Sequence, residues 1–360
     1  MKTNHPTQNV ALHIIAPLLV SIVAFGAAAR EETHSSTTAN RNLRPVIGVF
    51  SQETDTITGS STIDPEVKAE LSAYRYMIPA SYVTWVGQAG GRVLPILLRQ
   101  PRDYYDEIFA QTNGILFPGG NQGIDPRDIY TEEGEMLWNL AKQANDSGDY
   151  YPIWGTCLGF EELSVLETGN GDVISQNVMA TNLALSLRFT RSAEESRLFQ
   201  SFPPKLLRAL RTQRLTFNSH DHGLRVSEYE SNRSLNSFFD MLSYNRAPNG
   251  PFFVSTMEAR DYPFYGTQWH PEKNNFEWSQ NADYSNLPHS PNAILVSEAT
   301  ARFFLSEARK SGHTFPEAQR DELIYSAPII YTGKGDWIYE QVYVFCPKAA
   351  RGCEPNDPAQ

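Results

Sequence analysis

The stretch that most constrains this chain is an apolar run that ends in a glycine-flanked cysteine, Ile153-Trp-Gly-Thr-Cys157-Leu-Gly159. Apolar residues at helical spacing follow from Gly159, so the pattern predicts a buried strand, a sharp turn and a helix. A thiol on such a turn is the cysteine form of the G-x-S-x-G nucleophile elbow. The helix N-terminus behind it would favour a thiolate. We interpret Cys157 as a nucleophile, and a buried structural cysteine is the alternative.

Strand and helix patterns alternate on both sides of this turn. Strands are expected at 46–50, 92–97, 114–117 and 153–155, and helices at 78–86 and 131–145. This alternation predicts a mostly parallel sheet with helices on both faces. Ligands of such sheets bind beyond the carboxyl ends of the strands, where Pro118-Gly119-Gly120 and Cys157 should meet. The second half predicts adjacent strands at 252–257 and 264–269 and an amphipathic helix at 292–309.

A second chemical motif, Trp269-His270-Pro271-Glu272, ends the expected strand at 264–269. Proline favours extended geometry in the residue before it, and residues two apart in an extended stretch point to the same side. His270 and Glu272 can therefore form a base and its orienting carboxylate. Together with the upstream elbow they complete a Cys–His–Glu arrangement.

The chain termini predict processing and export. Lys2 precedes an apolar run from Ala11 to Gly26 and three alanines at 27–29, the pattern of a cleaved signal peptide. An uncleaved N-terminal anchor is the alternative. We therefore divide the chain into a signal peptide at 1–29, a polar leader at 30–44, a catalytic domain at 45–345 and a tail at 346–360.

In an oxidising compartment, the three cysteines are informative because an odd count leaves one thiol unpaired. We expect a disulfide between Cys346 and Cys353, which leaves Cys157 free. Asn145 and Asn232 lie in glycosylation sequons, expected on surface loops. The net charge of −11 argues against nucleic-acid and anionic-membrane binding. No Cys/His cluster has metal-ligand spacing, so no metal is expected.

Three motifs resemble the γ-glutamyl hydrolase family of the class I glutamine amidotransferase-like superfamily. They are Leu116-Phe-Pro-Gly-Gly120, Trp154-Gly-Thr-Cys-Leu-Gly-Phe-Glu-Glu-Leu163 and Tyr265-Gly-Thr-Gln-Trp-His-Pro-Glu-Lys273. The resemblance runs from about Pro45 to about Phe345. It implies a three-layer αβα sandwich around a mostly parallel sheet.

The resemblance also implies cleavage of γ-glutamyl isopeptide bonds in folate poly-γ-glutamates through a γ-glutamyl thioester, without a cofactor. The implied catalytic residues are Cys157, His270 and Glu272, with an oxyanion hole formed by the amides of Gly120 and Leu158. The implied substrate-binding residues are Tyr82, Gly119, His220 and Lys273. The protein is expected to enter the secretory pathway and to end outside the cell or in a lysosome or vacuole. No membrane contact is expected after signal cleavage.

Two other functions stay open at this point. One is a glutaminase or amidotransferase of the same superfamily, which would release ammonia from glutamine. The other is a secreted, non-catalytic binding protein on the same scaffold. Tyr82 could be core packing, His220 a solvated loop residue, and Lys273 or Arg188 ordinary surface charges instead of ligands of substrate carboxylates. A homodimer is as compatible with the sequence as a monomer.

Overall fold

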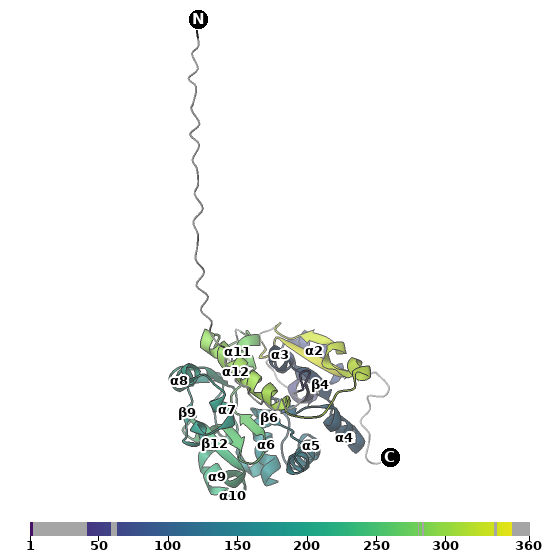
Figure 1. Cartoon of the computed structure of the whole chain (residues 1–360), viewed down its shortest axis with the longest axis vertical. Helices are drawn as coiled ribbons and strands as arrows, with labels where there is room; N and C mark the ends of the chain where they lie inside the picture. Colours follow the sequence, from purple (N-terminus) through teal and green to yellow (C-terminus); the bar gives the residue numbers. More distant parts are fainter. Residues whose placement is uncertain (3–41, 59–62, 280, 283, 335–336, 348–360) are drawn as a thin grey trace, which may run out of the picture. The chain divides into compact units, whose positions relative to one another are not determined.

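A computed structural model describes residues 1–2, 42–58, 63–279, 281–282, 284–334 and 337–347 (Figure 1). Within this part of the chain, the central sheet has eight strands in the order β4-β1-β5-β6-β14-β13-β12-β9. In that order the strands are β4 (Arg92–Ile96), β1 (Val46–Phe50), β5 (Ile115–Phe117), β6 (Ile153–Thr156), β14 (Phe264–Thr267), β13 (Phe252–Ala259), β12 (Phe239–Arg246) and β9 (Arg188–Phe189). The first five are parallel to one another, and β13, β12 and β9 continue the sheet in antiparallel pairs.

Helices cover both faces of this sheet. The helices are α1 (Asp55–Thr58), α2 (Pro65–Leu71), α3 (Ala80–Gln88), α4 (Arg102–Gln111), α5 (Ile129–Asp146), α6 (Leu158–Thr168), α7 (Arg197–Gln200), α8 (Pro204–Thr212), α9 (Val226–Ser231), α10 (Arg233–Phe238), α11 (Lys273–Phe276) and α12 (Pro291–Ala308). Short 3-10 turns lie at η1 (Gly171–Val173), η2 (Ser192–Glu194), η3 (Glu317–Glu322) and η4 (Ile324–Ser326). No helix in the described part of the chain has the length and apolar character of a membrane span.

The alternation of side chains along the strands produces two cores. In β1, Val46 and Phe50 point into a core shared with α4, α5 and α6, while Ile47 and Val49 point into a second core shared with α3, α8 and α12. All four side chains are fully buried. The structure thus confirms the expected α/β class, a three-layer sandwich around a mostly parallel sheet.

A smaller antiparallel sheet combines two strands that precede α3 with two from the C-terminal part of the chain, in the order β15-β16-β3-β2. Its strands are β15 (Ile329–Tyr331), β16 (Gln341–Pro347), β3 (Tyr74–Pro79) and β2 (Gln52–Glu53). Two further pairs join β10 (Thr216–Asn218) to β8 (Leu183–Leu185) and β11 (Gly223–Leu224) to β7 (Ile174–Ser175). The small sheet brings the C-terminal strand β16 against the start of α3.

Most expected elements are present, with ends that differ by a few residues. The helix expected at 78–86 begins only at Ala80, because Ile78 and Pro79 pair with Tyr343 and Val342 of β16. Strand β16 continues to Pro347, so the sheet extends past the expected boundary at Phe345.

Three expectations about processing concern the signal peptide, the disulfide and the two glycosylation sequons. Residues 3–41 and 348–360 lie outside the described residues. They include nearly all of the expected signal peptide, the expected leader up to residue 41, and Cys353 of the expected disulfide. Asn145 does not lie on a loop: it is in the last turn of α5, where its Nδ2 donates to the carbonyls of Ala141 and Tyr151. Asn232 caps α10 by accepting a hydrogen bond from the Leu235 amide.

Candidate active site

Cys157 lies on the predicted elbow between β6 and α6. Its backbone has φ 52° and ψ −108°, a region that residues with a side chain rarely adopt. A Cβ on Gly155 would lie 2.4 Å from the carbonyl oxygen of Gly159, and one on Gly159 would lie 2.0 Å from that of Phe117. The flanking glycines are therefore required by close backbone packing. The Cys157 amide donates to the carbonyl of Thr267 at 2.8 Å and ties the elbow to β14.

His270 and Glu272 form the expected pair. His270 Nδ1 lies 2.7 Å from Glu272 Oε1, and both side chains are buried. Because a carboxylate can only accept, the imidazole carries its proton on Nδ1 and presents the lone pair of Nε2. Nε2 has no hydrogen-bond partner in the described part of the protein. Strand β14 runs parallel to β6 with Thr267 opposite Thr156, which brings His270 to the end of the sheet that carries Cys157.

The two glycines after β5 complete this corner of the site. A methyl group on Gly119 would lie 2.7 Å from Cε1 of His270 and 3.1 Å from Cβ of Cys157, so both side chains converge on Gly119. The Gly119 amide donates to Oη of Tyr82 at 2.7 Å, and its carbonyl accepts from Nε2 of Gln52, also at 2.7 Å. Tyr82 Oη also lies 3.5 Å from His270 Nδ1. The hydroxyl of Tyr82, on α3, thus contacts both Gly119 and His270. A tyrosine that only packed in the core would not make these polar contacts.

The position of Gly120 agrees with its expected role. A Cβ there would lie 1.8 Å from Oε1 of Gln52, so any larger residue would displace the Gln52 side chain that holds Gly119. Gly120 and Leu158 both line the cavity beside Cys157, with Leu158 at the first position of α6, where backbone N–H groups have no partner inside the helix. The assignment of these two amides to an oxyanion hole stays a prediction.

Burial sets the electrostatics of the site. It raises the pKa of the Cys157 thiol well above its ordinary value, and the carboxyl groups of Glu161 and Glu272 raise it further. The nearby Leu158 amide opposes this but does not outweigh it. The expectation of a thiolate favoured by the helix terminus is therefore not met. Burial also lowers the pKa of His270 against the opposing effect of Glu272, so the resting pair is a thiol beside a neutral imidazole that can act as its base.

Lys273 lies elsewhere than expected. Its side chain is fully buried, with Nζ 3.8 Å from Glu272 Oε1 and 3.8 Å from the centre of the Tyr339 ring. Burial lowers the pKa of Lys273, and Glu272 opposes the shift. Burial alone would raise the pKa of Glu272, but His270 and Lys273 hold it below its ordinary value. The Lys273 ammonium therefore stabilises the ionised Glu272 carboxylate. Because the Lys273 side chain is fully buried, its position argues against direct contact with substrate carboxylates.

His220 is buried at the edge of the site instead of solvated on a loop. Its Nδ1 lies 2.6 Å from the carbonyl oxygen of His222, and its ring packs edge-on against Phe253. Burial lowers its pKa to about 4, so the imidazole is neutral. Arg188, in contrast, lies on the edge strand β9, exposed, with its guanidinium near the Phe252 ring.

A cleft passes over Cys157 and has two lobes. One lobe, of about 520 Å³, is here named the polar lobe, and the other, of about 510 Å³, the aromatic lobe. The polar lobe is lined by Leu158, Glu161, His220 and several aspartates, and the aromatic lobe by His270, Tyr284, Trp337, Ile338 and Tyr339. Both lobes share Gly120, Asn121, Cys157 and Ser219, so they meet at the thiol.

Sequence reasoning missed the wall of the aromatic lobe. Trp337 and Tyr339 precede β16, whose pairing with β3 carries them to the active site. Gln52, which holds Gly119, was also missed. The only signal in the sequence is the density of aromatic residues between Tyr331 and Tyr343.

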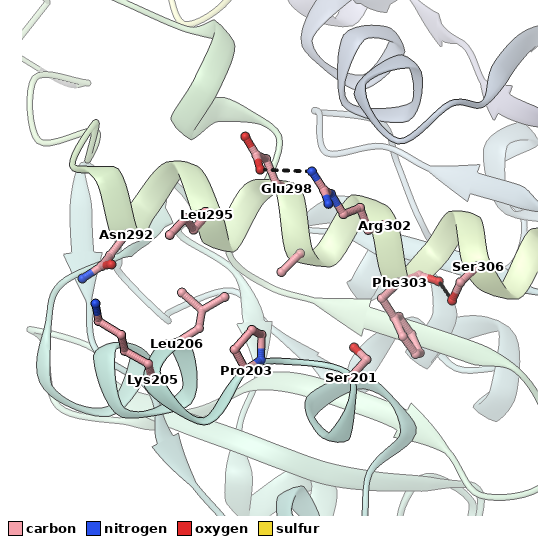
Figure 2. A pocket seen from close by; sticks show the side chains of 11 residues that line it. Ser201, Pro203, Lys205, Leu206, Asn292, Leu295, Glu298, Arg302, Phe303 and Ser306 are labelled. Atoms are coloured by element: carbon pink, nitrogen blue, oxygen red, sulfur yellow. Dashed lines mark hydrogen bonds and ion pairs between the residues drawn. The ribbon is translucent and has the colours of Figure 1, made fainter. Parts of the chain in front are cut away.

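A further cavity, of about 540 Å³, lies between α8 and α12 (Figure 2). Its lining includes the apolar side chains of Pro203, Leu206 and Phe303 and the ion pair between Glu298 and Arg302. It shares no lining residue with either lobe of the cleft. The chemistry of the site therefore belongs to the two-lobed cleft.

The chain is similar to known proteins over most of its length. The Peptidase C26 family model matches residues 45–272. The gamma-glutamyl hydrolase of Homo sapiens is 38% identical over 332 residues, which are 91% of this chain and 97% of the relative. Gamma-glutamyl hydrolase 1 of Arabidopsis thaliana is 36% identical over 89% of this chain and 88% of its own. Gamma-glutamyl hydrolase B of Dictyostelium discoideum is 38% identical over 74% of this chain and 76% of its own. Among solved structures, PurLQS from Thermotoga maritima covers 73% of this chain and 97% of its own at 12% identity, with a TM-score of 0.39.

Proposed function

Because this chain belongs to the peptidase C26 family, with gamma-glutamyl hydrolases as its relatives, we propose that it is a cysteine hydrolase of γ-glutamyl isopeptide bonds. The observation that carries the proposal is the convergence of Cys157 and His270 on Gly119. That convergence supports the proposal, because it would bring a nucleophile, a base and a glycine-lined approach for a carbonyl group into one part of the cleft.

The reaction follows from the proton positions. Sγ of Cys157 attacks the γ-carbonyl carbon while its proton passes to Nε2 of His270. The carbonyl oxygen becomes an oxyanion held by the amides of Gly120 and Leu158, each worth ~3 kcal/mol of barrier by analogy with other oxyanion donors. The C–N bond breaks as His270 returns the proton to the departing amine, which leaves a γ-glutamyl thioester. His270 then takes a proton from water, the hydroxide adds to the thioester, and the proton returns to the sulfur.

Glu272 acts on this sequence through His270. Its carboxylate fixes the ring orientation and stabilises the imidazolium that exists between the two proton transfers. Its low pKa keeps it ionised over the range in which the imidazole works. Tyr82 and Gln52 hold Gly119 in place and so keep the approach to the thiol open.

The substrate we propose is the γ-linked polyglutamate of folates, on the strength of the sequence motifs and the family. We further propose that the chain acts in the secretory pathway, outside the cell or in a lysosome or vacuole. The support is the charged and apolar N-terminal pattern of Lys2 and residues 11–26.

The test is an assay of two products. Incubation with pteroyl-polyglutamate should release glutamate or γ-glutamyl oligomers and shorten the folate chain, while glutamine should yield ammonia far more slowly. Faster ammonia release from glutamine would instead favour a glutaminase. A protein that shows neither activity, and whose Cys157 resists an iodoacetamide-type reagent, would be a binding protein.

A further inference from the structure

The general acid belongs to one lobe of the cleft. His270 lines the aromatic lobe, whereas Leu158, Glu161 and His220 line the polar lobe. His270 must reach the nitrogen that leaves, because its proton goes to that atom when the C–N bond breaks. The leaving amine is therefore directed into the aromatic lobe, and the acyl half of the substrate into the polar lobe.

The walls of the aromatic lobe have a definite chemistry. Trp337 and Tyr339 meet edge to face with ring centres 5.1 Å apart, and Tyr284 and Ile338 add further ring and methyl surface. Among the described residues that line this lobe, the polar side-chain groups outside the catalytic pair are all uncharged. They are the hydroxyls of Thr56, Ser219, Tyr284 and Tyr339, the amide of Asn121 and the indole N–H of Trp337. Among the described residues that line this lobe there is no lysine or arginine; Lys273 lies against the Tyr339 ring but is itself fully buried. Such a wall packs against rings and branched side chains better than it solvates a carboxylate.

Resting on the proposed function, we propose that the aromatic lobe is the leaving-group subsite and accepts amino acids with aromatic or branched apolar side chains. The protein then hydrolyses γ-glutamyl bonds to residues such as phenylalanine or leucine in addition to γ-glutamyl–glutamate bonds. The chemistry is the same: the C–N bond breaks, the amine of the departing amino acid takes the proton from His270, and water hydrolyses the same thioester.

The test uses substrates that share one acyl half. N-acyl-γ-glutamyl amides of phenylalanine, leucine, alanine and glutamate give the same thioester, and their leaving amines have similar basicity. We expect kcat/KM for the phenylalanine substrate to exceed that for the alanine substrate about tenfold, as burial of one ring allows. Deacylation is common to all four, so the preference should appear in kcat/KM and shrink in kcat wherever deacylation limits turnover.

Two substitutions of Ile338 should change the ratio of kcat/KM for the glutamate and phenylalanine substrates in opposite directions. Ile338→Arg adds a cation to the lobe and should raise kcat/KM for the glutamate substrate relative to the phenylalanine substrate, and Ile338→Glu should do the opposite. Tyr284→Ala should reduce the phenylalanine preference. Ile329→Arg and Tyr325→Ala are the matched controls, because both side chains are exposed and lie outside either lobe.

The outcomes separate this proposal from the proposed function. Equal kcat/KM for all four substrates, or no response of the glutamate-to-phenylalanine ratio to the charge at 338, would overturn the subsite. A uniform change in kcat for every substrate in Tyr284→Ala would place the acyl half in the aromatic lobe and also overturn it. Failure to hydrolyse any of the four, with Cys157 still reactive toward alkylation, would instead reject the proposed function.

Discussion

Oε1 of Glu272 lies 2.7 Å from Nδ1 of His270, and neither side chain reaches solvent appreciably. The expected extended stretch around Pro271 is wrong: the chain turns at Pro271-Glu272, and Glu272 has φ −71° and ψ −24° at the N-terminus of α11, so a turn brings the two side chains together. An ionised carboxylate in this position fixes the imidazole tautomer that leaves Nε2 free for the thiol.

Replacement of Glu272 by glutamine should therefore lower kcat/KM by about 10³–10⁴-fold, because a neutral amide no longer stabilises the imidazolium. The matched control is Glu162→Gln. Glu162 is buried on α6, accepts from Thr131, and has a pKa raised to about 8 by burial, so at neutral pH glutamine replaces an uncharged group. A Glu272→Gln enzyme within tenfold of wild type would show that the carboxylate does not act through His270.

Gly119→Ala tests the close approach at the corner of the site. The added methyl group would lie 2.7 Å from both His270 Cε1 and Tyr82 Oη, so the catalytic side chains must move. A displacement of this size should cost at least about 100-fold in kcat/KM. Gly87→Ala on α3, where no atom lies within 4 Å of the new group, should leave the activity and Tm near wild type. Equal behaviour of the two variants would remove Gly119 from the site.

Lys273→Met tests the buried ammonium through the pH profile. Burial lowers the pKa of His270, and the charge of Lys273 contributes to that lowering. The active base is the neutral imidazole, so kcat/KM falls as the pH drops through the pKa of His270. Without the Lys273 ammonium the pKa of His270 rises, so the acid limb, the low-pH side of the profile of kcat/KM against pH, should move to higher pH. Lys273→Arg should restore the limb in part, and the exposed control Lys205→Met should leave it unchanged. An unshifted limb in Lys273→Met would limit Lys273 to a packing role.

The number of glutamates in the substrate should change how kcat/KM responds to pH and salt. The protein carries a net charge of −11, and Asp125, Asp128, Asp172 and Asp221 line the polar lobe. Mild acid reduces the charge of a polyglutamate, while the low pKa of His270 keeps the base neutral. We expect kcat/KM for a penta-glutamyl substrate to favour mild acid more than that for a di-glutamyl substrate, and added salt to narrow the gap. Coincident profiles that ignore salt would contradict the long-range effect.

The parts of the site that could be predicted are those set by local chain geometry. The turn at Cys157 needs only its flanking glycines. The pairing of His270 with Glu272 was also predicted from nearby residues, but its geometry was not: the pair forms across a turn into α11, with Glu272 in a helical conformation, instead of along an extended stretch. The burial of Lys273 could not be predicted in this way, because Tyr339 reaches it through pairing between β16 and β3, which are more than 260 residues apart in sequence. The thiol pKa was misjudged for a related reason: the helix terminus is visible in the sequence, but the burial that outweighs it is not.

The central claim is that Cys157 carries γ-glutamyl transfer to water. The most direct measurement is the rate at which wild-type protein and Cys157→Ala shorten pteroyl-polyglutamate, with the thermal melting of both recorded alongside. We predict that the wild-type protein releases glutamate or γ-glutamyl oligomers and that Cys157→Ala releases none above background at an unchanged Tm. Turnover by Cys157→Ala near the wild-type rate, at an unchanged Tm, would contradict the account.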